Sequence, residues 1–400
     1  MIALGWGVTI LALVIWLYLL GGRGQFWRTD QQLPDFIPTP HPSPTLCVII
    51  PARNEADLLP QTLRSLFTQD YPGPVQIILV DDHSTDGTAD VAQAIAAACD
   101  RSPQLTVLTA QPLPPGWTGK LWALEQGIQV ALTFNPDYCL LTDADIAHDR
   151  SNLQRLVNYA EHNQLDLVSQ MVLLRCTSFW EKLLIPAFVF FFQKLYPFRW
   201  VNDPQNPTAA AAGGCSLLRR SALSRIGGIG CVRQALIDDC ALAQAVKISP
   251  RSPAHQGHSA ASGQIWLGLT ATTHSLRPYP TLKPIWDMVA RTAFTQLRYS
   301  PGLLVGSLGG MTIVYLVPPI GLLLGLLTQQ WVIAQLNLLT YGLMTLAYWP
   351  IVRFYRCGWG FACWLPLIAL LYNLMTIDSA LRHWRGQGGG WKGRVYDSPR

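Results

Sequence analysis

Two acidic pairs follow apolar segments that are typical of buried strands. Asp81-Asp82 come directly after VQIILV, and Asp143-Ala144-Asp145 come directly after YCLLT. Carboxylates this close repel one another, so a positive partner should neutralise them. Mg²⁺ suits this role, because it takes few protein carboxylates and several phosphate or water oxygens. One pair alone would indicate turns or helix caps, but two pairs predict a site for a divalent cation and a phosphorylated ligand.

The elements that must position these carboxylates alternate between strand and helix. Such alternation predicts a parallel sheet covered on both faces, with ligands beyond the carboxyl ends of its strands. Both acidic pairs fall at such ends. The expected strands are 46–52, 75–80, 105–109 and 138–142, and the expected helices are 55–69, 88–98, 120–132, 151–162 and 239–247.

Composition places the chain outside the ordinary soluble enzymes. Of its 400 residues, 50% are hydrophobic and only 13% are charged, against about 25% charged in a typical soluble domain. The net charge of +5 comes without a basic helix or an RNA-type aromatic motif, which argues against nucleic acid. The nine scattered cysteines contain no C-x-x-C pair, so reduced thiols facing the cytosol are expected.

The apolar residues gather at both ends of the chain. Residues 1–22 carry no charge and predict a transmembrane anchor, and Arg23 and Arg28 place the following segment on the cytoplasmic side. Residues 303–352 lack Asp, Glu, Lys, Arg and His, which is enough for two spans divided near Thr328-Gln330. The predicted organisation is an anchor (1–22), a linker (23–44), a catalytic domain (45–300), a transmembrane region (301–380) and a basic tail (381–400).

Four full crossings would place the basic tail outside, against the positive-inside tendency. One segment should therefore be re-entrant or interfacial, and 303–327, interrupted by Pro318-Pro319, is the candidate. The apolar run Phe188–Phe192 is expected to be either a helix in the membrane interface or a buried core helix. His255 and His258 lie in an apparent loop insertion without acidic or Cys partners, so no metal is assigned to them.

Six motifs occur in the order found in family-2 inverting glycosyltransferases, which the chain resembles over residues 45–300. They are PARNE (51–55), LVDDHSTDGT (79–88), TGKLWALEQG (118–127), TDAD (142–145), GGCSLLRR (213–220) and IDDCAL (237–242). The resemblance implies an α/β GT-A fold, Rossmann-like with a mostly parallel sheet. The segments 266–270, 290–300 and 391–394 resemble a narrower group, the membrane-bound hopene-associated glycosyltransferases, with lipid and carotenoid glycosyltransferases as relatives.

The resemblance also implies roles for individual residues. Arg53, Glu55, Asp81 and Asp82 would line the nucleotide pocket. Asp143 and Asp145 match a D-x-D motif, in which Asp145 would hold Mg²⁺ or Mn²⁺ and Asp143 would lie near the ribose and the metal. Asp239 would be the catalytic base that takes the proton of an acceptor hydroxyl. Asp238 would lie beside it, on the acceptor or diphosphate side, with capping of helix 239–247 as its alternative.

Other residues are assigned with alternatives. Lys120 stands at a predicted helix start, where a lysine and a helix N-terminus attract phosphate, or it is a solvated surface lysine. Gln296 and Arg298 resemble, with altered spacing, the Gln-x-x-Arg-Trp motif of processive synthases, and they are assigned to the acceptor or diphosphate side. The departure from that motif favours transfer of a single sugar.

The sequence thus predicts an integral membrane enzyme of a bacterial-type inner membrane, with its catalytic domain cytoplasmic. It would transfer a sugar with inversion from a nucleotide sugar, with a UDP-sugar expected, to a lipid acceptor that could be a hopanoid. A polyprenyl-phosphate or carotenoid sugar transferase is the alternative within the class, and a non-catalytic membrane scaffold is the alternative outside it. Retention of Asp82, Asp143, Asp145 and Asp239 argues against the scaffold.

Overall fold

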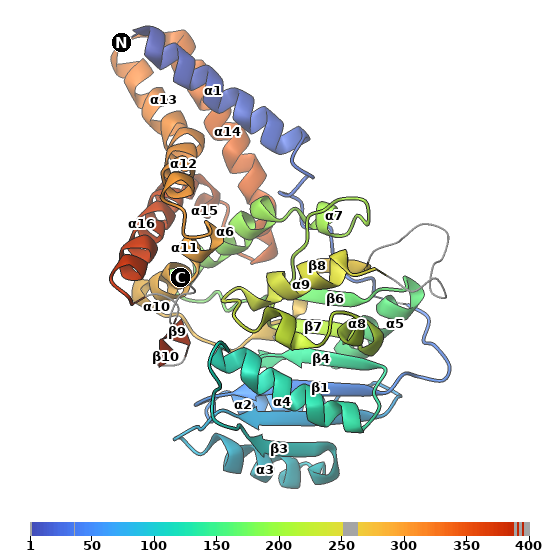
Figure 1. Ribbon diagram of the computed structural model, residues 1–400. Coiled ribbons are helices and arrows are strands. Elements are labelled where there is room, and N and C mark those ends of the chain that lie inside the picture. Colours follow the sequence, from blue (N-terminus) through green and yellow to red (C-terminus); the bar gives the residue numbers. More distant parts are fainter. Residues whose placement is uncertain (1, 36, 251–262, 388–389, 392–393, 396–400) are drawn as a thin grey trace.

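The computed structural model describes residues 2–35, 37–250, 263–387, 390–391 and 394–395, so His255, His258 and part of the predicted tail (388–389, 392–393 and 396–400) lie outside the described residues. An eight-stranded sheet with the order β3-β2-β1-β4-β7-β6-β8-β5 forms the centre (Figure 1). Its strands are β1 (Leu46–Ala52), β2 (Val75–Asp81), β3 (Leu105–Thr109), β4 (Tyr138–Thr142), β5 (Ile146–Ala147), β6 (Leu167–Leu173), β7 (Cys215–Arg219) and β8 (Ile265–Ser275).

The first four strands lie where the sequence predicts them and run parallel to one another. The expectation of a mostly parallel sheet is confirmed; the exception in the middle of the sheet is β7, which lies between β4 and β6 and runs antiparallel to both. The short strand β5 also runs antiparallel to β8, with Ile146 opposite Ser275. This pairing brings the end of β8 alongside the TDAD motif.

Helices cover both faces of the sheet, and their bounds lie close to the predicted ones. Helix α4 packs against β1 and β2, and Gly127 permits this close approach, because an added Cβ would lie 2.5 Å from Ile49 Cγ2. The helices of this part are α2 (Leu59–Phe67), α3 (Thr88–Ala98), η1 (Ser102–Gln104), α4 (Gly119–Thr133), α5 (Asn152–His162), α7 (Phe198–Val201), α8 (Arg220–Arg225), η2 (Ile229–Val232), α9 (Asp238–Ile248), α10 (Leu282–Ala290) and α11 (Ala293–Gln296).

The N-terminal and C-terminal helices form a separate layer that extends away from the sheet (Figure 1). Its members are α1 (Ile2–Gly21), α12 (Pro301–Met311), the π-helical turn η4 (Thr312–Leu316), α13 (Val317–Leu327), α14 (Trp331–Phe354), α15 (Gly360–Cys363) and α16 (Leu365–Trp384). A small hairpin of β9 (Gly390–Trp391) and β10 (Arg394–Val395) follows.

Within the described residues, one helix is long and apolar enough to cross a membrane: Pro301–Leu327, formed by α12, η4 and α13. The apolar N-terminal helix, Gly5–Gly21, is shorter. By length and composition, Pro301–Leu327 is a candidate for a full crossing, and the assignment of 303–327 as re-entrant or interfacial stays a prediction. The chain turns back on itself after α14. The Tyr341 hydroxyl near the middle of that helix donates to the Cys363 carbonyl at 2.7 Å, where α16 is about to begin.

Helix α6 (Phe179–Leu195) joins the two layers and contains the Phe188–Phe192 run. Val189 and Phe190 are buried. The ring of Phe191 packs edge-on against those of Tyr315 in η4 and Tyr372 in α16. The structure therefore agrees with a buried core helix and contradicts a helix lying on the molecular surface, because the C-terminal helices cover the aromatic side.

Candidate active site

A cavity of about 680 Å³ opens at the carboxyl ends of the central strands. This volume is in the range of small-molecule sites. One wall is charged and includes Glu55, Lys120, Asp143, Asp145, Asp238, Asp239 and Arg277. A second wall carries the apolar side chains of Leu174, Phe188 and Phe192 near α6 and of Pro284 and Met288 on α10, and the charged Asp287, Arg291 and Arg382 also line the cavity. The cavity thus joins the acidic motifs to the layer of apolar helices.

The PARNE and DDHSTDGT motifs interlock at the ends of β1 and β2. Arg53 Nη1 donates to the backbone carbonyl of Asp82 at 2.6 Å and lies 3.5 Å from its carboxylate. The Glu55 amide donates to the Thr88 hydroxyl at the start of α3. Arg53, Asp81 and Asp82 do not line the cavity, whereas Glu55 does. Of the predicted nucleotide residues, Glu55 therefore lies at the edge of the cavity, and the other three lie beside it.

Asp145 is the most enclosed carboxylate of the D-x-D motif, with its side chain 10% exposed. The Arg277 guanidinium holds it, with Nε 2.8 Å from Asp145 Oδ2 and Nη2 2.6 Å from Glu55 Oε1. Burial and the nearby Asp143 raise the pKa of Asp145, and Arg277 opposes that rise. One cation therefore connects two predicted donor-site residues.

Lys120, in the first turn of α4, neutralises Asp143 and Asp238. Its ammonium lies 2.9 Å from Asp143 Oδ1 and 3.6 Å from Asp238 Oδ2. Burial alone would lower the pKa of Lys120, but the charges of Asp143 and Asp238 outweigh it and raise that pKa. The prediction of a solvated surface lysine is therefore wrong, because this side chain is enclosed among carboxylates.

Asp239 is held by two backbone amides. Its Oδ2 accepts from Gly213 N at 2.9 Å and its Oδ1 accepts from Cys240 N at 2.7 Å. Burial and the adjacent Asp238 raise the pKa of Asp239 to about 6, in spite of Lys120. A carboxylate with such a pKa is suited to accepting a proton near neutral pH. Asp238 is the first residue of α9 and does not cap it, since the cap position is Ile237, so the capping alternative is wrong.

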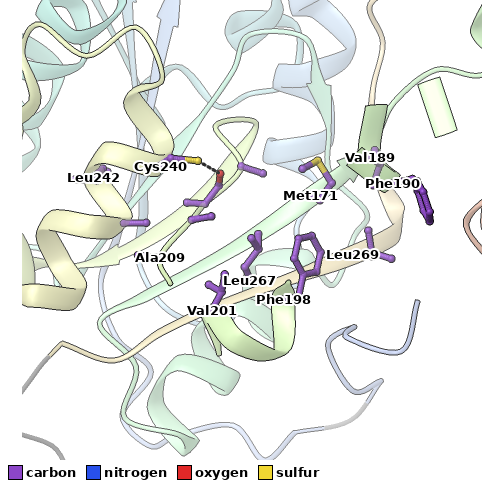
Figure 2. Close-up of a cluster of buried hydrophobic side chains, with 14 of the residues drawn as sticks. Met171, Val189, Phe190, Phe198, Val201, Ala209, Cys240, Leu242, Leu267 and Leu269 are labelled. Atoms are coloured by element: carbon purple, nitrogen blue, oxygen red, sulfur yellow. Dashed lines mark hydrogen bonds between the residues drawn. The ribbon is translucent and has the colours of Figure 1, made fainter. Parts of the chain in front are cut away.

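Close packing around the neighbouring Cys240 holds the Asp239 carboxylate in place. The Cys240 thiol, one residue further along α9, donates to the Ala211 carbonyl at 3.7 Å and lies in a buried cluster with Leu242 and Ala209 (Figure 2). Gly213 follows that alanine segment, and an added Cβ there would lie 3.2 Å from Lys120 Nζ and 3.5 Å from Asp239 Oδ2. The backbone at Gly213 therefore lies close to both charged groups, and a larger residue there would crowd the Lys120 ammonium.

Glu181 ties the two walls of the cavity together. At the start of α6 it completes a capping box with Ser178, and its other carboxylate oxygen accepts from Tyr279 N at 2.7 Å. Tyr279 lies two residues after Arg277. The segment that carries the guanidinium and the helix that carries Phe188 therefore share one buried carboxylate.

The structure does not bring the predicted Gln296 and Arg298 into the cavity wall. Gln296 Nε2 donates to the Tyr196 hydroxyl at 2.6 Å, at the end of α6. Arg298 is exposed on a turn and has a φ of +52°. The altered spacing of this motif thus corresponds to a different placement, and Arg298 does not join the described site.

The residues present fit a divalent cation. Within the described ranges, no group of three or more His, Cys, Asp or Glu side chains could hold a metal ion by itself. A pair of carboxylates, Asp143 and Asp145, instead faces a cavity large enough for a diphosphate, as Mg²⁺ sites completed by substrate phosphates require. That Asp145 is matched by a guanidinium shows that the site demands positive charge.

Sequence reasoning missed Arg277, the cation that joins Glu55 to Asp145. It lies 132 residues from Asp145, and no motif marks it. The available signal was its place just after the long apolar strand that begins at WLGLT, because the end of a strand in such a sheet is where ligand residues gather.

The fold and part of the sequence are similar to known glycosyltransferases. The fold resembles that of a mannosyltransferase from Pyrobaculum calidifontis, solved in complex with GDP-Man and Mn²⁺, with a TM-score of 0.52 and 17% identity over 96% of both chains. The α/β domain with its D-x-D edge therefore has the GT-A fold of glycosyltransferases. Residues 47–227 match the family described as Glycosyl transferase family 2.

Two curated relatives each match more than a third of the chain. A 4,4'-diaponeurosporenoate glycosyltransferase of Staphylococcus aureus (strain bovine RF122 / ET3-1) is 32% identical over 155 residues, which is 38% of this chain and 37% of that protein. A Bacillus subtilis (strain 168) protein named "Probable glycosyltransferase YdaM" is 28% identical over 152 residues, 36% of this chain and 34% of its own length. The chain thus aligns with about a third of the length of these relatives.

Proposed function

We propose that this protein is a membrane-bound, inverting glycosyltransferase that transfers one sugar from a nucleotide-sugar donor to a lipid acceptor. The observation that carries the proposal is the set of residues that line the cavity. Its charged wall holds the D-x-D motif and Asp239, and its apolar wall is built by α6 and α10 beneath the helical layer. A sugar donor suits the first wall, and a lipid suits the second.

The helical layer supports the membrane part of the proposal. Large exposed apolar patches on a protein mark contact with membranes or partners. Side chains of this kind that are at least 40% exposed include Ile10, Leu11, Val14 and Leu17 on α1, Leu303, Val305, Leu323 and Leu327 on α12 and α13, and Trp331, Val332, Leu338 and Leu346 on α14. These helices would keep the cavity at the bilayer surface, where a lipid acceptor resides.

The proposed chemistry is a single displacement at the anomeric carbon. The acceptor oxygen forms a bond to that carbon, the bond to the donor diphosphate breaks, and Asp239 takes the acceptor proton. Lys120 and Arg277 lie where they can neutralise the charge that develops on the leaving group. A bound Mg²⁺ or Mn²⁺, held by Asp145 and Asp143, would add Lewis-acid stabilisation of the diphosphate.

The chemical class of the acceptor can be inferred from the group that would attack the anomeric carbon. A hydroxyl, as in a hopanoid side chain, requires a base, whereas a carboxylate or a polyprenyl phosphate is already anionic. A base with a pKa of about 6 favours a hydroxyl acceptor. The relative that acts on 4,4'-diaponeurosporenoate favours a carotenoid, so hopanoid and carotenoid lipids are both candidates.

The test is transfer from labelled UDP-sugars and GDP-sugars into bacterial membrane lipids, with Mg²⁺ or Mn²⁺ and with chelator. We expect label in an extractable lipid that disappears with chelator, and mass spectrometry then identifies the acceptor. Folded protein that binds no nucleotide and labels no lipid from hopanoid, carotenoid or polyprenyl-phosphate pools would refute the proposal.

A further inference from the structure

Arg277 holds the position that the proposed chemistry gives to a metal. Its guanidinium bridges Asp145 and Glu55 with two charge-assisted hydrogen bonds of 2.8 and 2.6 Å. The two carboxylates are 10% and 8% exposed. Buried carboxylates without a partner are costly, so some cation must reside here whether or not a donor is bound.

The backbone fixes Arg277 in this position. Ile146 pairs with Ser275 across β5 and β8, and the Leu276 amide donates to the Asp145 carbonyl at 2.8 Å. The Arg277 amide in turn contacts the Ser275 hydroxyl. The register of two strands therefore delivers this arginine to the metal-ligand carboxylate. The side chain itself remains 30% exposed toward the cavity, so it has room to swing.

Charge balance requires that the guanidinium and a divalent cation compete. Arg277 already occupies one oxygen of each carboxylate, Asp145 Oδ2 and Glu55 Oε1, and a cation approaching Asp145 alone would meet the positive charge of the guanidinium. A cation that arrives with a nucleoside diphosphate differs, because the diphosphate oxygens offer the planar guanidinium a bidentate anionic partner in place of Asp145.

We propose that Arg277 is a resting-state counter-ion for the metal site, displaced from Asp145 when a divalent cation enters together with the donor diphosphate. This inference rests on the proposed function. It makes metal and nucleotide binding mutually supportive: each strengthens the other by the same factor, as thermodynamic linkage demands. The free protein therefore binds metal weakly and is protected from taking up cations when no donor is present.

The experiment is a titration of the detergent-solubilised full-length protein with Mn²⁺, followed by the EPR signal of the free ion, with and without UDP or GDP. In the wild type we expect weak Mn²⁺ binding that the preferred nucleotide strengthens. Arg277→Gln should bind Mn²⁺ alone more tightly, by roughly tenfold, because removing one close charge changes the cation affinity of a carboxylate by about that factor or more. The strengthening by nucleotide should shrink in the same variant.

Arg291→Gln is the matched control, since Arg291 lines the same cavity and its loss changes the net charge equally. It should alter Mn²⁺ affinity much less. Arg277→Lys keeps the charge without the two-pronged contact and should shift the affinity in the same direction by less. Equal or weaker Mn²⁺ binding by folded Arg277→Gln, or an effect matched by Arg291→Gln, would overturn the inference. A wild type that binds neither Mn²⁺ nor nucleotide would instead overturn the proposed function, and the inference with it.

Discussion

Replacement of Asp239 by asparagine is the sharpest test of the proposed chemistry. The variant keeps the shape of the side chain and one acceptor oxygen but cannot accept a proton. General-base catalysis contributes about 10²–10⁴-fold in rate, or about 2.7–5.4 kcal/mol of activation free energy at 1.36 kcal/mol per decade. We therefore expect kcat for a hydroxyl acceptor to fall by about 10²–10⁴-fold.

The structural cost of the same change is smaller. Asp239 accepts from the Gly213 and Cys240 amides, and the amide nitrogen of asparagine would leave one of them unpaired, a loss of about 1–3 kcal/mol of folding stability. The variant should remain folded and should bind donor with an affinity close to that of the wild type. Thermal melting and calorimetry with UDP or GDP measure these two properties separately from turnover.

The pH profile gives a second readout of the same group. With a pKa of about 6 for Asp239, the active carboxylate form predominates above pH 6 and is lost as pH falls. At pH 5 the wild-type rate should be roughly one tenth of its plateau, from the protonation equilibrium of a single group. Asp238→Asn, which removes the neighbouring charge, is the control and should lower rather than raise that apparent pKa. A loss below about tenfold in Asp239→Asn, or a flat wild-type profile from pH 5 to 7, would refute the assignment.

Three further predictions follow from other contacts. Asp145→Ala should weaken Mn²⁺-dependent nucleotide binding by at least tenfold, measured by calorimetry with and without chelator, and unchanged binding would remove it from the metal site. Lys120→Met should leave two carboxylates without their cation and so lower the melting temperature and weaken donor binding; a variant as stable and as tight-binding as the wild type would contradict its role. The thiols of Cys176 and Cys357 lie 3.6 Å apart, so diamide, which takes up the two electrons and two protons, should join them in a disulfide; mass spectrometry of the peptides detects it, and no link in folded protein would mean that the loops after β6 and α14 do not meet.

The local part of this fold could be predicted, because it is written in short-range patterns. The strands β1 to β4 are apolar runs, and α3 begins after Gly87 in its left-handed conformation with a φ of +83°, as the DG turn indicates. What the pattern cannot show is the sheet order beyond β4, because the antiparallel placement of β7 depends on packing between segments far apart in the chain.

The candidate site likewise contains features that local sequence patterns predict and features that depend on long-range packing. The placement of Asp143 and Asp145 at the cavity was predicted, since both follow a strand end, although Asp81 and Asp82 lie outside the cavity lining. Arg277 and the enclosure of Lys120 were not, because both depend on which cation reaches which buried carboxylate. Helix α6 was ambiguous for a related reason: its aromatic residues suit a membrane surface and a protein core equally well, and only the covering helices decide between them.

The single carboxylate of Glu181, which receives the Tyr279 amide while it caps α6, has a consequence for how such an enzyme can diversify. A substitution that reshapes the apolar wall by tilting α6 also pulls on the segment that carries Arg277. Backbone changes that alter acceptor preference would thus also alter donor binding. Directed evolution toward a new lipid should therefore succeed more often through side-chain changes at Phe188 or Met288 than through changes in the backbone of the helix itself.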